Sequence, residues 1–306
     1  MRNGGGEIPE GVCLFWQQVI NAIWLGAVYS LFALGYTLVF SVLGILNLAY
    51  PSLYMWGAFF GLFAVNVLKL PIWAALPIAM AGSGLLGVLV DWLAFRPLRK
   101  RQAPELAALI SSIGTSIILV NVAQGVFSAQ VSRFPFDTFP IRVFTLGPVT
   151  ITLLQITILC VSLGIMLVLR WLIRNTRQGQ AMRAVAFNPG TAARLGIPVE
   201  RVIRQTAFIA GALAGAAGVL LGLAFNTVSP YMGGPMNLKG LTVIILGGLG
   251  NIEGAVLGGF ILAFSEVMSV AYFSSDLRDG IAFLLLILIL LFRPNGLLGR
   301  TTSKRA

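Results

Sequence analysis

Histidine is absent from this sequence, and cysteine occurs only twice in its 306 residues. The two cysteines, Cys13 and Cys160, lie far apart within apolar runs, so they indicate neither a metal cluster nor a disulfide framework. The Gly-x-x-x-x-Gly-Lys-Ser/Thr loop that cradles nucleotide phosphates is missing as well. The sequence therefore predicts a protein that is not an enzyme and has no metal or cofactor of its own.

Charged residues are scarce, at 10% of the chain, whereas 58% of the residues are hydrophobic and the mean hydropathy is +0.91. Soluble domains carry about 25% charged residues, so this composition indicates a polytopic membrane protein, with 1–306 as a single transmembrane domain. The net charge of +11 does not indicate nucleic-acid binding, because the basic residues lie in loops between apolar runs. The polar N-terminus lacks a cleavage signature, so the first span is expected to be retained.

Apolar runs separated by short polar gaps predict an all-α membrane protein with about eight crossings and broken helices. The runs cover 12–48, 52–70, 72–95, 107–127, 149–172, 206–225, 241–272 and 281–292. Two of them, 12–48 and 241–272, exceed the roughly 20 residues of one crossing, and the number of passes in each stays open. The first is interrupted at Gly26, Gly35 and Gly44 and again at Asn47–Ser52, and the second at Gly247–Gly254. Irregular backbone is tolerated at membrane depth only inside protein or beside a cavity.

Arginine and lysine concentrate in three gaps, 96–101, 170–204 and 293–305, and the positive-inside rule places all three in the cytoplasm. This placement requires an even number of passes between the second gap and the third. The run 241–272 must therefore cross twice or return to the side on which it began. Both termini, including a tail at 293–306, are expected to be cytoplasmic.

The segment 174–204 is the one long polar interval in the chain, and it contains residues that typically start and end helices. Asn188 followed by Pro189 is typical of a helix N-cap, and Gly196 stands where a left-handed C-terminal residue belongs. Two short helices, at 179–187 and about 189–195, are therefore predicted between membrane spans. With arginines around them, they form a candidate docking surface on the cytoplasmic side.

Polar and small residues within the spans are candidates for a solute path. Ser112 and Ser116 share a face of the run 107–127, with hydrogen bonding to neighbouring helices or within the helix as the alternative. Leu43–Asn47 is similar to Leu246–Asn251 with one insertion, and paired broken helices indicate a substrate pathway near the membrane midplane. Glycines of the run 206–225 instead predict close helix packing. The candidate path residues are Asn47, Tyr50, Ser112, Ser116, Gly247, Gly248, Asn251 and Glu253.

Several stretches together have the order and spacing of one known family. They are GYTLVF at 35–40 leading to Asn47, RPLR at 96–99, ALISSIG at 108–114, GQAMRA at 179–184, LGI at 195–197, LGGLG at 246–250 and RPNGLLG at 293–299. Over nearly its whole length the chain resembles the permease subunits of branched-chain amino-acid ABC importers, the LivH type. The resemblance implies a membrane-spanning subunit that moves amino acids into the cytoplasm.

The resemblance also implies partners and a coupling element. In such importers a cytoplasmic loop of the permease docks on the ATPase subunit, which binds the ATP, and 174–204 is expected to be that loop. The residues expected to couple are Gly179, Arg183, Ala184, Asn188, Arg194 and Gly196. A second permease subunit, either LivM-like or another copy of this chain, and a periplasmic substrate-binding protein would complete a complex in the bacterial inner membrane, with no nucleic acid involved.

One departure from the family leaves the substrate open. The family usually has Asn-Phe-Ala-His-Gly where this chain has Asn47-Leu48-Ala49-Tyr50-Pro51, so a titratable histidine is replaced by a phenol and a flexible glycine by a rigid proline. Branched-chain or other neutral and hydrophobic amino acids are the expected cargo, and urea or small carboxylates are the alternatives. The outer loops around 128–147, 226–239 and 273–279 would receive the solute.

An ion-coupled secondary transporter is the competing class, and it would use the intramembrane acids Glu253 and Glu266. The spans offer no evident cationic partner for either acid, which argues against a proton relay. Glu253 is also placed to cap the N-terminus of a half-helix. Whether these acids are structural or functional stays open.

Overall fold

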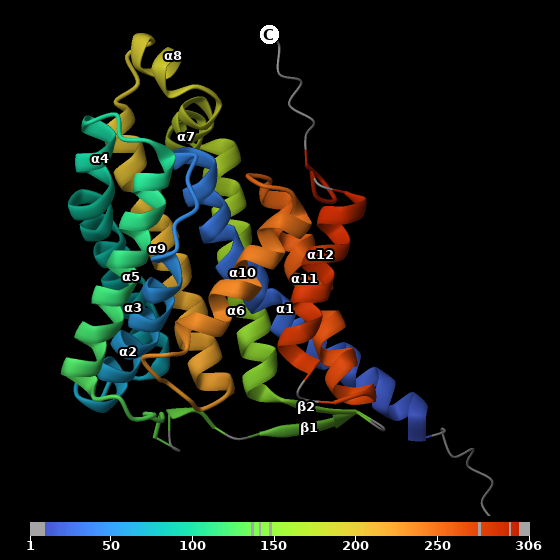
Figure 1. Cartoon of the computed structure of the whole chain (residues 1–306). Helices are drawn as coiled ribbons and strands as arrows, with labels where there is room; N and C mark the ends of the chain where they lie inside the picture. The colour runs from blue at the N-terminus through green and yellow to red at the C-terminus, as the bar shows by residue number, and fades with distance from the viewer. Residues whose placement is uncertain are drawn as a thin grey trace, which may run out of the picture.

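Long apolar helices run side by side between two ends of the molecule (Figure 1). The computed structural model describes residues 10–135, 138–140, 142–146, 149–274, 277–293 and 295–299. Most of the predicted basic tail, 300–306, and the first residues of the chain lie outside the described residues, as does part of the predicted loop 128–147. Within the described part, six helices are long and apolar enough to cross a membrane. This confirms the all-α polytopic fold.

The described elements follow one another in a simple order. They are α1 (Glu10–Leu43), α2 (Tyr50–Asn66), α3 (Ile72–Val90), a π-helical turn η1 (Asp91–Phe95), α4 (Arg96–Lys100), α5 (Glu105–Phe127), β1 (Val143–Leu146), β2 (Val149–Thr152), α6 (Leu153–Asn175), α7 (Arg177–Phe187), α8 (Pro189–Arg194), α9 (Val199–Ala224), α10 (Gly233–Gly247), α11 (Ile252–Tyr272) and α12 (Leu277–Phe292). The strands form an antiparallel hairpin, so the predicted span 149–172 begins later, at Leu153.

The hairpin and the two short helices α7 and α8 lie at opposite ends of the bundle (Figure 1). Near the start of α1, the side-chain oxygen of Gln17 accepts a hydrogen bond from the backbone N–H of Thr150 at 2.9 Å. Near the other end of α1, Val42 packs in one apolar cluster with Met182 and Val185 of α7. We call these two ends the hairpin end and the α7–α8 end.

The two ends of the described chain lie at opposite ends of the bundle, so the prediction that both termini share one side is wrong. Helix α1 begins at the hairpin end, whereas the segment after α12 reaches the α7–α8 end, where Leu297 N–H donates to Leu246 O at 2.8 Å. Helix α1 is one unbroken helix of 34 residues, so 12–48 crosses only once before the chain turns back. The described helices α1, α2, α3, α5, α6, α9, α10, α11 and α12 run alternately toward one end of the bundle and the other. Six helices of the described chain meet the length and hydropathy of a membrane span, and the figure of about eight crossings stays a prediction.

Two glycines that suggested a break in α1 serve close packing instead. A Cβ on Gly26 would lie 2.7 Å from the ring of Phe260 in α11, and a Cβ on Gly35 would collide with the hydroxyl of Tyr50. The same holds for α9, where Gly215 lies against Gly57 of α2 and against α3. The prediction of close packing for this glycine-rich helix is confirmed.

Two shorter helices begin inside the bundle rather than at its ends. The Tyr50 hydroxyl at the start of α2 donates to Phe32 O in α1 at 3.1 Å and to Ala210 O in α9 at 3.2 Å, and both acceptors lie near the middle of their helices. A Cβ on Gly233, at the start of α10, would lie 2.8 Å from Pro51 O. The starts of α2 and α10 therefore meet at mid-depth. The interval 226–239, expected as an outer loop, instead leads back into the bundle and opens a helix.

The order α1, break, α2, α3 is repeated upside down as α9, break, α10, α11. Helix α3 packs along α9 while α11 packs along α1, and these are the most extensive helix contacts in the bundle. This is the arrangement of an inverted-topology repeat. The corresponding breaks are 44–49 and 225–232, so the sequence similarity between Leu43–Asn47 and Leu246–Asn251 pairs the wrong segments.

Candidate functional sites

The α7–α8 pair is anchored to the membrane helices by specific contacts. The Thr176 hydroxyl caps α7 by accepting from Gly179 N–H at 3.1 Å, and Arg183 donates to Ile173 O of α6 at 2.7 Å. Gly179 is buried so closely against Leu172 and Ile173 that it has no room for a side chain. Of the residues predicted to couple, Gly179 and Arg183 thus fix α7 to the end of α6.

The helix N-cap and the left-handed C-terminal residue that the sequence predicts for this segment are present in the structure. The Asn188 side chain accepts from Thr191 N–H at 2.9 Å, which caps α8, and Gly196 has φ +82°. Ala184 packs partly buried against the apolar cluster that joins α7, α8 and α9, whereas Arg194 is exposed. The two predicted short helices thus form a single unit that is joined to α9 through Pro198.

Two exposed apolar side chains on this unit were not identified from the sequence. Phe187 is 93% exposed and Leu195 is 76% exposed. Each stands directly before a helix signal, Phe187 before the cap Asn188 and Leu195 before Gly196. The sequence feature that could have predicted them is the presence of large apolar residues in a polar, arginine-rich loop. Exposed aromatic and aliphatic side chains of this kind mark contact sites for other proteins.

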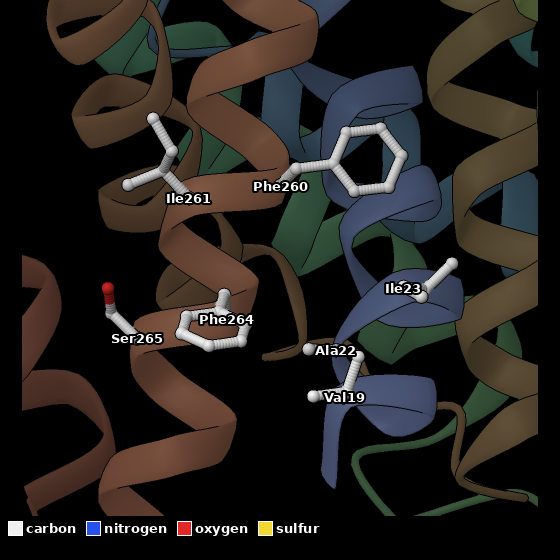
Figure 2. A pocket seen from close by; sticks show the side chains of 7 residues that line it. All are labelled: Val19, Ala22, Ile23, Phe260, Ile261, Phe264 and Ser265. Atoms are coloured by element: carbon white, nitrogen blue, oxygen red, sulfur yellow. The ribbon is translucent and has the colours of Figure 1, made fainter. Parts of the chain in front are cut away.

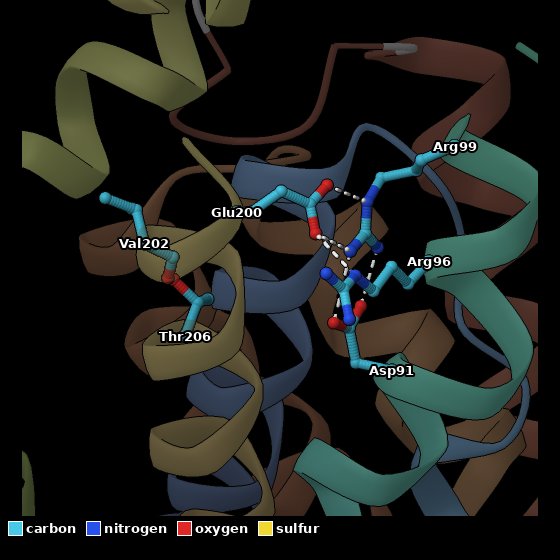
Figure 3. A network of polar contacts seen from close by, with 6 residues as sticks. All are labelled: Asp91, Arg96, Arg99, Glu200, Val202 and Thr206. Atoms are coloured by element: carbon cyan, nitrogen blue, oxygen red, sulfur yellow. Dashed lines mark hydrogen bonds and ion pairs between the residues drawn. The ribbon is translucent and has the colours of Figure 1, made fainter. Parts of the chain in front are cut away.

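An ion-pair cluster joins the start of α9 to η1 and α4 (Figure 3). Arg99 makes a bidentate contact with Asp91 at 2.6 and 3.1 Å, and it also reaches Glu200 at 3.3 Å. Arg96 lies 3.5 Å from Glu200. Glu200 stands in the first turn of α9, where the helix dipole favours an acid. Its contacts also tie α9, which follows the α7–α8 unit directly, to the end of α3.

A cavity of about 180 Å³ lies at mid-depth, where α2 and α10 begin and α5 passes. Ser52 of α2 and Ser116 of α5 both line it, and their hydroxyl groups form a hydrogen bond of 2.9 Å. Its polar lining also includes Asn237, whose Oδ1 is buried and has no hydrogen-bond partner among the described residues. No charged side chain is among the described residues that line it.

The predicted path residues in the first half of the chain belong to this cavity or support its wall. Ser116 lines it, and Ser112 accepts from Leu48 N–H at 3.2 Å, which holds the loop that closes it. Asn47 caps the same loop by accepting from Ala49 N–H at 3.0 Å. Tyr50 is buried behind the wall. Sequence reasoning missed Ser52 of α2, and it missed Asn237 because α10 was not expected to begin before 241.

The predicted path residues in the second half lie elsewhere, in the turn between α10 and α11 at the α7–α8 end. Gly247 O accepts from Leu298 N–H at 3.2 Å, and the Asn251 side-chain amide donates to Leu298 O at 2.7 Å. Gly248 packs against Gly299. Glu253 forms an ion pair with Arg174 at the end of α6. The structure does not bring these four residues to the mid-depth cavity. Gly247, Gly248 and Asn251 hold the segment after α12, and Glu253 pairs with α6.

A larger apolar cavity of about 340 Å³ lies between α1 and α11 (Figure 2). Val19, Ala22 and Ile23 place it in the half of α1 nearer the hairpin end, and Phe260, Ile261 and Phe264 face them from α11. Ser265 is the one polar side chain in its lining among the described residues. This lining offers little to a polar solute, so the mid-depth cavity is the better candidate for a path.

Both intramembrane acids have cationic partners, and the expectation that the spans provide none is wrong. Glu266, which is 1% exposed, accepts from Lys239 Nζ at 2.8 Å and from the Tyr29 hydroxyl at 3.2 Å, and it also contacts Arg278. Glu253 is paired with Arg174. Lys239 had been assigned to an outer loop, and Arg174 is distant in sequence, so neither pairing was visible. The cap of α11 is the side chain of Asn251, which accepts from Glu253 and Gly254.

A multi-pass helical bundle with inverted halves, helices broken at mid-depth and a short-helix unit at one end defines a membrane transport subunit. Residues 18–290 match the family described as "Branched-chain amino acid transport system / permease component", and the chain belongs to this family. It is 36% identical over 304 residues to the high-affinity branched-chain amino acid transport system permease protein LivH of Salmonella typhimurium, covering 96% of this chain and 98% of the relative.

Two further comparisons agree with this membership. The permease protein BraD of a Pseudomonas aeruginosa high-affinity branched-chain amino acid transport system is 34% identical over 304 residues, with coverage of 96% and 98%. A solved structure titled "PsaBC from Streptococcus pneumoniae in complex with Fab" has a TM-score of 0.51 at 13% identity, covering 90% of this chain and 91% of that one. The latter likeness supports the fold alone. The comparisons do not favour urea, small carboxylates or an ion-coupled mechanism.

Proposed function

We propose that this chain is the membrane-spanning subunit of an ATP-driven importer that moves branched-chain amino acids into the cytoplasm. The relatives that cover nearly its whole length are permease proteins of branched-chain amino acid transport systems. The chain lacks a phosphate-binding loop, so ATP would be hydrolysed by a separate subunit. A bacterial inner membrane with the α7–α8 end in the cytoplasm agrees with the basic residues gathered there.

The observation that carries this proposal is the α7–α8 unit with its exposed Phe187 and Leu195. It projects beyond the ends of the membrane helices (Figure 1), and it is anchored rigidly to α6 and α9 by Gly179, Arg183 and Ala184. An ATPase subunit that receives the two apolar side chains in a groove would move the unit as one body. Asn188, Arg194 and Gly196 then set the shape and charge of the contact.

The membrane part of the proposal places the solute path at the mid-depth cavity. A second permease subunit, LivM-like or a second copy, would complete the path, and a periplasmic binding protein would deliver the solute at the hairpin end. Polar but uncharged lining suits a net-neutral solute that must leave as easily as it enters. Asn47, Tyr50, Ser112 and Ser116 form or support this lining.

The test is uptake of radiolabelled leucine by proteoliposomes that contain the assembled complex, with binding protein outside the ATP-containing lumen. Phe187→Ala combined with Leu195→Ala should weaken co-purification of the ATPase and lower uptake at least about tenfold, as loss of an interface hot spot does. Phe273→Ala is the matched control for co-purification of the ATPase, because Phe273 is 80% exposed but lies near the hairpin end, away from the α7–α8 unit.

Uptake by the parent complex that proceeds on a proton or sodium gradient without ATP would overturn the proposal. A double variant that behaves like Phe273→Ala would remove the α7–α8 unit from the docking surface.

A further inference from the structure

The walls of the mid-depth cavity differ in the charge that they favour, and the family comparison does not describe this difference. One wall is made by the first turns of α2 and α10, which start within the bundle and meet where Gly233 lies against Pro51. The positive ends of two helix dipoles are therefore directed toward the same small space, and this favours a negative group. Broken helices use their N-terminal ends in this way toward anionic substrate groups in other transporters.

The opposite polarity is supplied by Asn237, in the second turn of α10. Its Oδ1 is buried and finds no donor among the described residues, although the side chain borders the cavity. A buried acceptor without a partner is costly, and a bound donor such as an ammonium group would relieve the cost. The paired hydroxyls of Ser52 and Ser116 add groups that can donate or accept.

The remaining wall is mainly apolar. Leu48, Met55 and Val120 line the cavity together with Pro230, and Tyr231 also borders it. These side chains suit an aliphatic group rather than a polar or aromatic one, given a cavity of only about 180 Å³. No charged side chain stands among the described residues of the lining, so a ligand with a net charge would have no counterion there.

We propose that this cavity is a binding site for a zwitterionic amino acid with an aliphatic side chain, held during its passage through the membrane. The ammonium group is bound by Asn237 Oδ1, the carboxylate faces the starts of α2 and α10, and the side chain rests on Leu48, Met55 and Val120. Selection for the amino-acid backbone then takes place within the permease as well as in the binding protein. This inference rests on the proposed transport function and assigns its recognition step to named residues.

The experiment measures protection of a thiol placed at the border of the cavity. Tyr231→Cys is introduced into a chain in which Cys13 and Cys160 are replaced by serine, because Tyr231 borders the cavity and is 60% exposed. The full complex is assembled in nanodiscs without binding protein, and the rate of labelling by a small maleimide is measured against the concentration of leucine or of 4-methylpentanoate, the analogue that lacks the ammonium group. Leucine should slow labelling and the analogue should not.

Asn237→Leu in this background should raise the half-protecting concentration of leucine at least about tenfold, because a hydrogen bond to a charged group is lost. Asn237→Asp keeps the acceptor and should retain protection, which separates a binding role from a packing role. Asn121→Leu is the matched control, since Asn121 is exposed on α5 and its side chain bonds only within its own helix.

Equal protection by leucine in the Asn237→Leu and Asn121→Leu backgrounds would overturn the assignment of Asn237. Failure of leucine to protect the thiol in a complex that still transports it would overturn the site and leave the proposed function standing. A parent complex that does not transport branched-chain amino acids in the presence of binding protein and ATP would instead remove the proposed function itself.

Discussion

Removal of the buried carboxylate of Glu266 should destabilise the protein more than removal of its lysine partner. Glu266 Oε1 accepts from Lys239 at 2.8 Å and from Tyr29 at 3.2 Å, and it also contacts Arg278. The side chain of Glu266 is 1% exposed and that of Lys239 is 9% exposed. One anion therefore compensates two cations, of which Lys239 is buried and Arg278 is 38% exposed.

The expected magnitudes follow from what each variant leaves behind. Glu266→Gln leaves Lys239 and Arg278 facing each other without an anion, and unpairing buried charges of this kind costs about 3–5 kcal/mol. Lys239→Met removes the hydrogen bonds of Lys239 to Glu266 and to the Tyr29 hydroxyl. It leaves Glu266 with Arg278 and Tyr29, so no buried charge stays unpaired and the loss is roughly 1.5–3 kcal/mol. The double variant should cost less than the sum of the two, because the residues share one network.

The free energy of unfolding is measured by reversible titration with SDS in mixed micelles, with Lys69→Met as the control. Lys69 is exposed, so its variant should stay within about 0.5 kcal/mol of the parent. If Lys239→Met costs as much as Glu266→Gln or more, the carboxylate is not the centre of the network. If both variants fall within the range of the control, the network does not stabilise the start of α10 at all.

Two further predictions concern helix packing and the ion cluster. Gly215→Ala places a Cβ 2.8 Å from Ala79 O and should cost about 1–3 kcal/mol through overpacking. Gly164→Ala is the control, because nothing lies within 4 Å of its added Cβ, and it should not lower the melting temperature. Equal melting temperatures of the two variants would contradict the prediction. Arg99→Lys loses the bidentate contact with Asp91 and should lower the melting temperature measurably more than the control Arg101→Lys, because Arg101 is exposed. A decrease no larger than that of the control would show that the bidentate contact of the guanidinium group does not stabilise the protein.

Much of the fold was predictable because it depends on local signals. Apolar runs identified the helices, and Asn188 and Gly196 marked the boundaries of α8, since a cap and a left-handed residue act within one turn. The path through the membrane depended on longer-range facts. Gly26 and Gly35 resembled helix breakers in sequence, but they admit Phe260 and Tyr50 from other helices. Only the packing partner distinguishes a glycine that breaks a helix from one that allows close approach.

The candidate site was partly predictable for the same reason. Asn47 and Ser116 lie in or beside obvious irregularities of apolar runs, and both belong to the mid-depth cavity or its wall. Asn237 and Lys239 were hidden because the stretch before 241 is polar and resembles a loop. A polar segment can be buried when its charges are paired within the protein, as Lys239 is with Glu266. Single-sequence hydropathy does not register such pairing.

The breaks before α2 and before α10 place the cavity where motion of the α7–α8 unit can change its shape. The α7–α8 unit leads directly into α9, and α9 packs against both α2 and α3. Glu200 and Arg99 add a polar tie between α9 and the end of α3 (Figure 3). A displacement of the α7–α8 unit is therefore expected to move α9 together with α2. Helix α10 is instead held by Lys239 to α11, which packs along α1. Because α2 and α10 begin face to face, motion of α9 and α2 relative to α10 and α11 changes the space between the first turns of α2 and α10, and this is the space that the cavity occupies.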